Sequence, residues 1–313
     1  MPASTPFLVH WDEAPAKQHA AGDIQGRWTL LGEACGSVNV GLRRIQLEPG
    51  FRSTPPHAHG AEEEIFYVLG GSGLLWQDGA VCEVGPGDCI VHGAEGAAHT
   101  LRGGDGGLDV LAFGTRVMIE LCYLPRAGMA WGGPTVVAAP GLKNLWENDA
   151  AAGPLHFPPP GPRPANVVRL DQVEPMVRRR GETRLLARFL PEQAGSKRSG
   201  LNHFLVEPGG CSWPLHCHGA EEEIFVVLDG QGVLILGDDE HPVRAGHVVS
   251  RPPGTGIAHQ FRAGPSGLIL LAYGTREPND IAYYPKSGKV FLRGIGVIGK
   301  IDPLPYWDDD PIG

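Results

Sequence analysis

The sequence lacks long hydrophobic runs and an excess of positive charge. No segment approaches the roughly 20 apolar residues of a membrane span, and no basic stretch followed by an apolar one opens the chain. Its 26 lysines and arginines stand against 35 aspartates and glutamates, a formal charge of −9, without a basic stripe that could neutralise phosphates. We therefore expect neither a membrane nor a nucleic acid as partner.

Cysteine is also scarce. The six cysteines show neither CxxC spacing nor the density of a disulfide scaffold, so free thiols in a reducing compartment are the simplest interpretation. Together with the missing membrane and leader segments, this predicts a soluble, cytoplasmic protein.

Glycine and proline, by contrast, are abundant, with 46 and 29 residues in a chain of 313. Short β-branched and aromatic runs alternate with Gly, Pro and Asp, and no long stretch has a 3.6-residue apolar period. A hydrophobic content of 42% argues against disorder, and the length suffices for two domains. The composition favours an all-β sandwich or barrel architecture with minor helices.

The chain repeats itself. The segment HAHGAEEEIFYVL at 57–69 returns as HCHGAEEEIFVVL at 216–228, an offset of 216 − 57 = 159 residues. Three other pairs keep that offset within a residue: 41–50 with 200–209, 108–116 with 268–276, and 123–131 with 283–291. We predict an N-terminal domain at 1–155, a proline-rich linker at 156–165 and a C-terminal domain at 166–313.

Each copy contains a histidine pair that could bind a metal ion. In a strand, His57 and His59 would point to the same side, and a carboxylate from the run Glu62, Glu63, Glu64 could join them. A third imidazole, His99, follows a Gly/Pro-rich turn. Alternation alone does not choose between Glu63 and Glu64, because the residues on both faces after them are apolar; Glu62 is more simply a solvated turn residue.

These residues resemble the two motifs of the cupin superfamily, G-x5-H-x-H-x3,4-E-x6-G and G-x5-P-x-G-x2-H-x3-N, and the duplication resembles a bicupin. Glu64 lies six residues before Gly71, as the first motif requires, and Glu223 lies six before Gly230. The departures are minor: an extra residue after Gly50, Ala245 in place of a proline, and no terminal asparagine in either second motif.

The resemblance implies two tandem cupin barrels (double-stranded β-helix or jelly-roll), each holding one divalent transition metal on three histidines and a glutamate. The implied ligands are His57, His59, Glu64 and His99 in the first copy, and His216, His218, Glu223 and His259 in the second. Iron, manganese, nickel, copper and zinc all suit such a set, so the ligands do not select the metal.

For function, the ligand set is similar to that of flavonol-cleaving dioxygenases. Our leading hypothesis is a dioxygenase acting on a small substrate that chelates the ion through oxygen, with Glu64 and Glu223 as ligands and bases. The alternatives are a non-redox lyase, isomerase or hydrolase, and a non-enzymatic binding bicupin. Oxalate decarboxylases carry an arginine three residues before the first motif histidine, where this chain has Thr54 and Trp213.

Other polar residues in the repeats are more simply structural than catalytic: Arg44, Gln46, His92, His203, His247 and the strand-end arginines Arg116 and Arg276. Cupin barrels often exchange N-terminal strands, so the segments before Arg27 and Arg184 could support a homo-oligomer.

Overall fold

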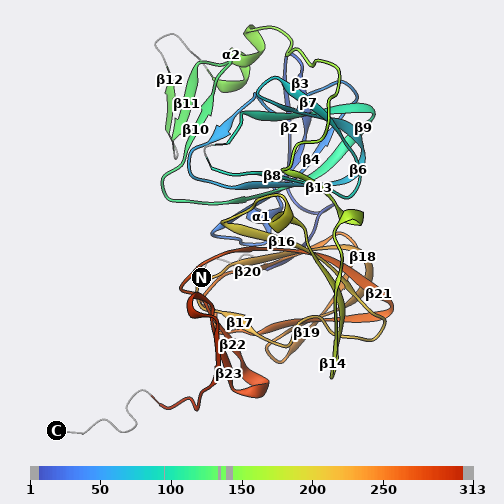
Figure 1. Ribbon diagram of the computed structural model, residues 1–313, viewed down its shortest axis with the longest axis vertical. Coiled ribbons are helices and arrows are strands. Elements are labelled where there is room, and N and C mark those ends of the chain that lie inside the picture. The colour runs from blue at the N-terminus through green and yellow to red at the C-terminus, as the bar shows by residue number, and fades with distance from the viewer. Residues whose placement is uncertain (1–6, 95, 133–134, 139–143, 306–313) are drawn as a thin grey trace, which may run out of the picture.

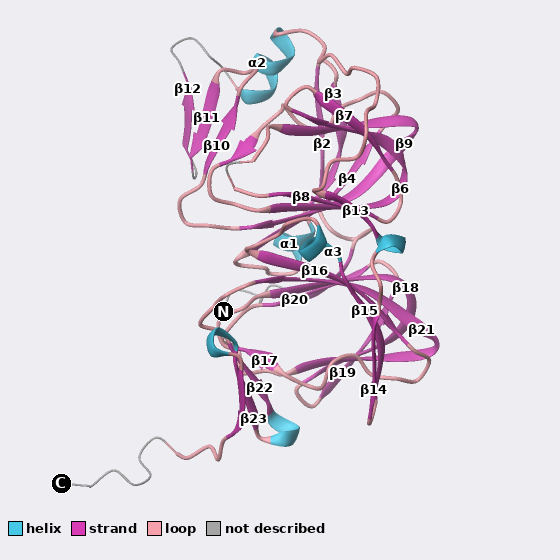
Figure 2. Ribbon diagram, viewed as in Figure 1, coloured by secondary structure: helices cyan, strands magenta, loops and turns pink. Residues whose placement is uncertain are grey.

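The computed structural model describes residues 7–94, 96–132, 135–138 and 144–305, and it consists of two β barrels stacked on each other (Figure 1). Each barrel combines one 8-stranded sheet with a smaller 4-stranded sheet. Helices are short and few in the described ranges, as Figure 2 shows. The predicted all-β fold with two tandem barrels is confirmed.

The large sheet of the first barrel has the order β13-β8-β6-β9-β4-β3-β2, with β7 paired to β6. Its strands are β2 (Ala16–Ala21), β3 (Ile24–Thr29), β4 (Val40–Leu47), β6 (Glu64–Gln77), β7 (Ala80–Val84), β8 (Asp88–His92), β9 (His99–Thr115) and β13 (Val167–Arg169). The small sheet, in the order β12-β11-β10-β5, contains β5 (Ala58–His59), β10 (Leu121–Leu124), β11 (Met129–Gly132) and β12 (Thr135–Ala138).

The second barrel repeats this topology, with the large-sheet order β1-β20-β18-β21-β16-β15-β14 and β19 paired to β18. Its strands are β1 (Leu8–His10), β14 (Met176–Arg180), β15 (Thr183–Phe189), β16 (Ser199–Val206), β18 (Glu223–Leu236), β19 (Asp239–Arg244), β20 (His247–Arg251) and β21 (His259–Thr275). The small sheet is β17 (Cys217–His218), β22 (Ile281–Tyr284), β23 (Lys289–Leu292) and β24 (Val297–Lys300).

The helical segments are α1 (Leu31–Ala34), α2 (Leu145–Ala151) and α3 (Leu190–Gln193), with 3-10 turns η1 (Leu170–Gln172), η2 (Pro285–Ser287) and η3 (Arg293–Ile295). Helices α1 and α3 lie between the two barrels (Figure 2). Among the helices that the structure describes, none has the length and apolarity to cross a membrane. All six cysteines are free and buried.

The two barrels exchange their N-terminal strands. Strand β1, from the start of the chain, pairs with β20 of the second barrel, and β13, which follows the predicted linker, pairs with β8 of the first. This exchange lies within one chain, and the homo-oligomer stays a prediction. The division at 156–165 stays a prediction, and each predicted domain contributes one strand to the sheet of the other.

The central strand β6 is apolar on both faces because both faces are buried. Phe66 and Val68 pack inside the first barrel, whereas Ile65 and Tyr67 pack in a core shared by the two barrels. In the second barrel, β18 directs Phe225 and Val227 inward and Ile224 and Val226 into the shared core. Across this core the rings of Phe113 and Tyr273 stack at 5.1 Å.

The motif glycines occupy bulges of the central strands. The β6–β9 register shifts between Val68 and Gly70 and again between Gly71 and Gly73. Gly71 has a φ of +75°, and a Cβ there would meet the Gly107 carbonyl oxygen at 2.2 Å. Gly230 repeats this with φ +80° and the Gly267 oxygen at 2.3 Å. Only glycine fits such a position, which explains the glycine that ends the first motif.

Candidate metal centres

Two adjacent segments bring the first histidines to the mouth of the barrel. His57 and His99 exchange backbone hydrogen bonds, with N···O distances of 3.3 and 2.9 Å, and His59 lies in β5 two residues after His57. Because side chains alternate along an extended chain, His57 and His59 face the same side, with ring centroids 5.1 Å apart. The identical bridge joins His216 to His259.

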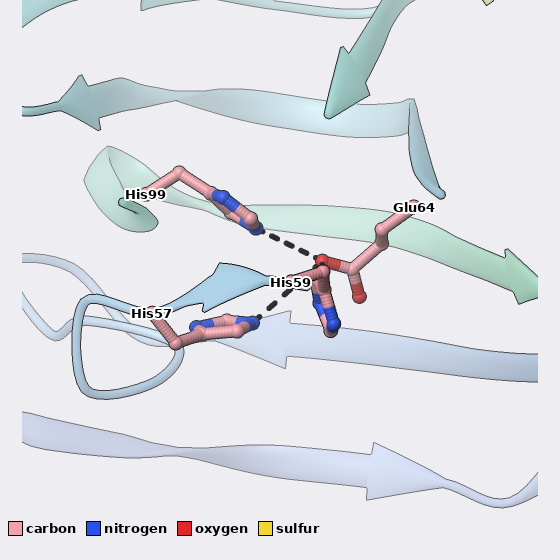
Figure 3. Close-up of side chains that lie close together, drawn as sticks. All are labelled: His57, His59, Glu64 and His99. Atoms are coloured by element: carbon pink, nitrogen blue, oxygen red, sulfur yellow. Dashed lines mark hydrogen bonds and ion pairs between the residues drawn. The ribbon is translucent and has the colours of Figure 1, made fainter. Parts of the chain in front are cut away.

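In the first set, three imidazoles converge on one carboxylate oxygen (Figure 3). Oε2 of Glu64 lies 3.0 Å from Nε2 of His99, 3.6 Å from Nε2 of His59 and 3.8 Å from Nε2 of His57. We call His57, His59, Glu64 and His99 the first ligand set. Candidate ligand atoms of all four lie within 4.8 Å of one another.

The second ligand set consists of His216, His218, Glu223 and His259, and candidate ligand atoms of the first three lie within 4.8 Å of one another. Oε2 of Glu223 lies 3.0 Å from Nε2 of His259, 3.4 Å from Nε2 of His218 and 3.9 Å from Nε2 of His216. Each predicted quartet is therefore brought together, while the assignment of its members as metal ligands stays a proposal.

The structure separates the three glutamates of each run. Glu64 begins β6 and faces the barrel interior together with Phe66, whereas Glu63 shares the opposite face with Ile65 and points to the other barrel. Glu63 accepts hydrogen bonds from Ser196 and Ser199 at 2.6 Å. Glu62 accepts one from the Val117 backbone N–H at 3.1 Å.

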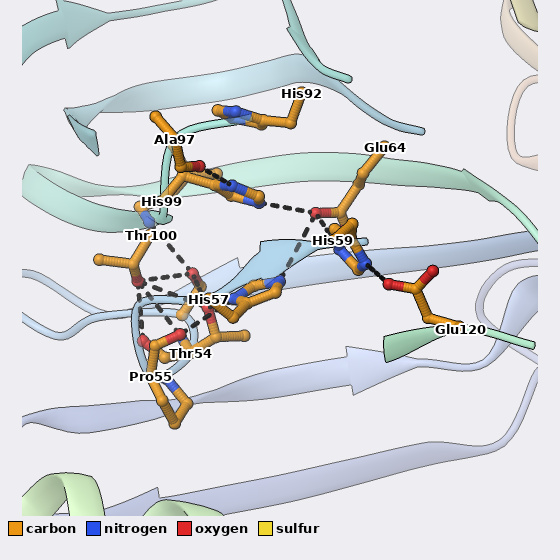
Figure 4. Close-up of polar contacts among 12 residues, drawn as sticks. Thr54, Pro55, His57, His59, Glu64, His92, Ala97, His99, Thr100 and Glu120 are labelled. Carbon is orange, nitrogen blue, oxygen red and sulfur yellow. Dashed lines mark hydrogen bonds and ion pairs between the residues drawn. The ribbon is translucent and has the colours of Figure 1, made fainter. Parts of the chain in front are cut away.

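Backbone carbonyls orient several of the imidazoles (Figure 4). The Nδ1–H groups of His57 and His99 donate to the carbonyls of Pro55 and Ala97 at 3.0 and 3.2 Å, and His216 donates to Pro214 at 2.7 Å. These bonds fix the tautomer, so the unprotonated Nε2 faces the glutamate. Such outer contacts are typical of metal-binding histidines.

Sequence reasoning missed two carboxylates that orient the remaining histidines. Nδ1 of His59 lies 3.2 Å from Oε1 of Glu120, and Nδ1 of His218 lies 2.7 Å from Oδ2 of Asp280. Glu120 also accepts three backbone N–H groups of residues 60–62 at 2.8 to 3.0 Å. The repeat could have revealed this pair, because 280 − 120 = 160 is the offset that also relates Arg116 to Arg276.

The site's electrostatics leave most of its groups in the forms that bind cations. Burial raises the pKa of Glu64, but the three imidazoles hold it well below its usual range. Burial, with the charge of His57, lowers the pKa of His99 to about 4, and burial with His259 lowers that of His216 to about 4. Burial opposes a charge on His59, yet Glu64 and Glu120 raise its pKa to about 9. A metal would therefore displace a proton from His59.

Unpartnered atoms support the fit of an ion. Among the described residues, the buried Nε2 atoms of His59, His218 and His259 and Oε2 of Glu223 make no hydrogen bond of good geometry, although Nε2 of His259 and Oε2 of Glu223 lie 3.0 Å apart. Buried polar atoms are ordinarily satisfied, and these four point into the two matched sites, where a metal ion would satisfy them. Imidazole nitrogens and a carboxylate form a donor set suited to a divalent transition metal.

The other polar residues from the sequence fall in different places. His92 lies inside the first site, where its ring stacks on His99 at 3.5 Å. Outside the ligand sets, Arg44 pairs with Asp109 at 2.6 Å and Arg276 with Glu192 at 3.1 Å. Gln46 accepts a hydrogen bond from Arg27, and His203 is buried on β16. His247 is the β-strand partner of His10, and the side chain of Arg116 lies beside Gly41.

Comparisons with known proteins agree with this geometry. The model of the Cupin domain family matches residues 43–109 and 202–269, one segment in each barrel. No curated protein matches the sequence.

Among solved structures, a Bacillus subtilis oxalate decarboxylase, described for its Mn(II) centres, matches with a TM-score of 0.57 at 16% identity over 87% of this chain and 78% of that chain. A Lactobacillus farciminis oxalate decarboxylase in complex with formate matches with a TM-score of 0.59 at 14% identity over 86% of each chain. Such identities show the fold alone.

These structural relatives are decarboxylases, so the comparisons give no support to the dioxygenase expected from the ligand set. The two family matches and the fold of these solved structures agree with the sequence repeat and with the two barrels. Two segments of the chain, one in each barrel, match the Cupin domain family, and the fold is that of a bicupin with two tandem domains.

Proposed function

We propose that the protein is a metal-dependent enzyme of the lyase class that cleaves a small organic substrate chelating the ion through oxygen. One observation carries the proposal: in both barrels three imidazole Nε2 atoms converge on one carboxylate oxygen at 3.0 to 3.9 Å. The reaction class is chosen because the structural relatives are oxalate decarboxylases. It replaces the dioxygenase hypothesis, and it stands at the level of analogy.

The two ligand sets would each hold one divalent metal. A bound ion would supply Lewis acidity, which stabilises negative charge developing on the substrate oxygens. Oε2 of Glu64 and of Glu223 faces the histidines, and Oε1 of each is the atom that would accept or return a proton. Glu120 and Asp280 would keep His59 and His218 in position.

The surroundings restrict the substrate. The second ligand set borders a cavity of about 10 Å³ whose other walls include Phe204, Phe225, Phe261 and Leu270. This volume accommodates a group the size of one water molecule. Trp213, at the position where oxalate decarboxylases carry an arginine, also lines it. These walls favour a small substrate and give no support to oxalate itself.

Metal analysis tests the sites. Protein purified without added metal should hold one divalent transition metal per ligand set, and His57→Ala and His216→Ala should each lose one of the two ions. Absence of metal from the wild type, after reconstitution with manganese, iron or zinc, would contradict the proposal and favour a non-enzymatic binding protein.

Product analysis tests the reaction. The metal-loaded protein is incubated with a panel of small 2-oxo and hydroxy acids in an oxygen-electrode cell with CO2 detection. A lyase releases product without consuming O2. Consumption of one O2 per turnover would restore the dioxygenase, and it would refute the lyase.

A further inference from the structure

The two ligand sets have different neighbours at one matched position. In the antiparallel register, Glu64 of β6 pairs directly with His92 of β8, and Glu223 of β18 pairs directly with Arg251 of β20. Directly paired residues point to the same face of a sheet. The face of Glu64 and Glu223 is the barrel interior, so each barrel directs a different side chain toward its ligand set.

In the first barrel this side chain is an imidazole that stacks on a ring of the first ligand set. His92 is buried, and its ring lies parallel to that of His99 at 3.5 Å. An imidazole lacks the two-pronged guanidinium geometry that holds a carboxylate, so the first site does not gain this contact.

In the second barrel the same position carries a buried guanidinium. Arg251 is 6% exposed, and its Nη2 donates to the Ile257 carbonyl at 2.8 Å and to Oγ1 of Thr255 at 3.3 Å. Its Nε is buried and has no hydrogen-bond partner among the described residues. Arg251 and Glu223 are direct partners in the β18–β20 register, so their side chains extend from neighbouring points on the same face of the sheet.

Arg251 lacks the partner that a buried arginine normally has. Within the described ranges, no carboxylate oxygen lies within 4.0 Å of its guanidinium nitrogens. A buried charge without a counter-charge is costly, and an arginine fork is suited to a carboxylate. A divalent ion on the second ligand set would add further positive charge beside this guanidinium.

We propose, on the basis of the function proposed above, that Arg251 makes the second metal centre the carboxylate-binding site of the protein. The ligand is a small carboxylate anion, held by the guanidinium beside the ion. The first centre, with His92 at the matched position, lacks this anion contact.

The test measures anion binding rather than turnover. His57→Ala removes a ligand of the first centre, so that a manganese-loaded full-length chain reports on the second centre alone. Formate is titrated into this protein by calorimetry, and formamide, which is uncharged, serves as the matched ligand. We expect formate to bind and formamide to bind at least about tenfold more weakly.

Variants at Arg251 are then compared in the same background. Arg251→Gln removes the charge, and Arg251→His installs the side chain of the first centre; both should weaken formate binding about tenfold or more while the manganese content stays unchanged. Arg262→Gln is the control, because that arginine is 40% exposed and pairs with Glu240 at 2.8 Å on the surface. It should leave formate binding unchanged.

The outcomes separate the two proposals. Manganese retained with formate affinity within twofold of the background in either Arg251 variant would overturn the carboxylate site and leave the metal centres intact. Failure of the background protein to hold manganese would overturn the proposed function, and with it this inference. Where one variant does not fold, the other decides, since both lack the guanidinium.

Discussion

His59 and His218 each contact a carboxylate through the ring nitrogen that faces away from the glutamate of the ligand set. We predict that Glu120→Ala and Asp280→Ala lower the metal affinity of their own centre about 10- to 100-fold, because each histidine loses the group that fixes its ring. Titration of metal-free protein with Mn(II) measures this. Glu83→Ala, at an exposed position, is the control. Equal Mn(II) affinities of Glu120→Ala and this control would contradict a role of Glu120 in positioning His59.

A single buried histidine remote from the ligand sets should make stability depend on pH. His203 on β16 is 6% exposed and pairs with Arg188 and Leu271. Burial, aided by the charge of Arg188, lowers the pKa of His203 to about 4. In the unfolded chain His203 is protonated as the pH falls through about 6.5, whereas in the folded chain it stays neutral until about pH 4. The contribution of His203 to the free energy of unfolding is therefore fully present above pH 6.5. It falls as the pH drops toward 4, by up to about 1.4 kcal/mol per pH unit.

His203→Gln tests this dependence. Denaturant unfolding of the metal-free protein is followed between pH 7 and pH 4, and the variant should lose less stability over that window than the wild type. Parallel curves for the two proteins would show that His203 does not contribute.

At the scale of elements, the central strands connect the barrels through their second glutamates. Glu63 accepts hydrogen bonds from Ser196, Ser199 and the Lys197 N–H of the second barrel, and Glu222 accepts from Ser37, Val38 and Asn39 of the first. Both carboxylates are almost fully buried, at 2% and 0% exposure. Each therefore satisfies several donors that have no access to water.

We predict that Glu63→Ala or Glu222→Ala destabilises the protein by about 3 kcal/mol, because buried N–H and hydroxyl donors are left without an acceptor. Thermal unfolding measured with and without metal gives the loss. Glu33→Ala, on the exposed side of α1, should change the stability by less than about 0.5 kcal/mol. A loss of that small size in Glu63→Ala would show that these contacts do not hold the barrels together.

Much of this architecture could be predicted from the sequence. The repeat at 57–69 and 216–228 predicted the two barrels, and the motif spacing to Gly71 selected Glu64. In the structure, the β6–β9 register shifts on either side of Gly71, where a glycine is required. Alternation could not choose between Glu63 and Glu64, since Ile65 and Tyr67 are buried between the barrels, and a core shared by two domains is invisible to a single-strand pattern.

Other features needed three-dimensional information. The repeat relates Glu120 to Asp280, but their contacts with His59 and His218, 61 and 62 residues away, are visible only in the structure. The contrast between His92 and Arg251 depends on strand register, which sequence alone does not give. The exchange of β1 and β13 is equally non-local, because neither three-residue strand carries a distinctive pattern.

At the scale of the whole molecule, the exchanged strands β1 and β13 hold the two barrels together independently of the linker. We predict that a chain with a protease site inserted after the exposed Pro160 stays associated after cleavage, because β1–β20, β13–β8 and the shared core remain. Size-exclusion chromatography with light scattering measures the mass. Truncation of residues 1–11, which removes β1, is the comparison and should weaken the association. Separation of the cleaved halves in the otherwise intact chain would contradict this role of the exchanged strands.

The reciprocal exchange has the arrangement of a two-fold symmetric dimer whose subunits have been joined end to end. In a dimer of identical chains, any mutation appears in both sites at once, so a histidine in one centre and an arginine in the other could not coexist. Joining the halves in one gene removes that constraint. The covalent link therefore permits matched positions of the two barrels to carry different side chains, as His92 and Arg251 do.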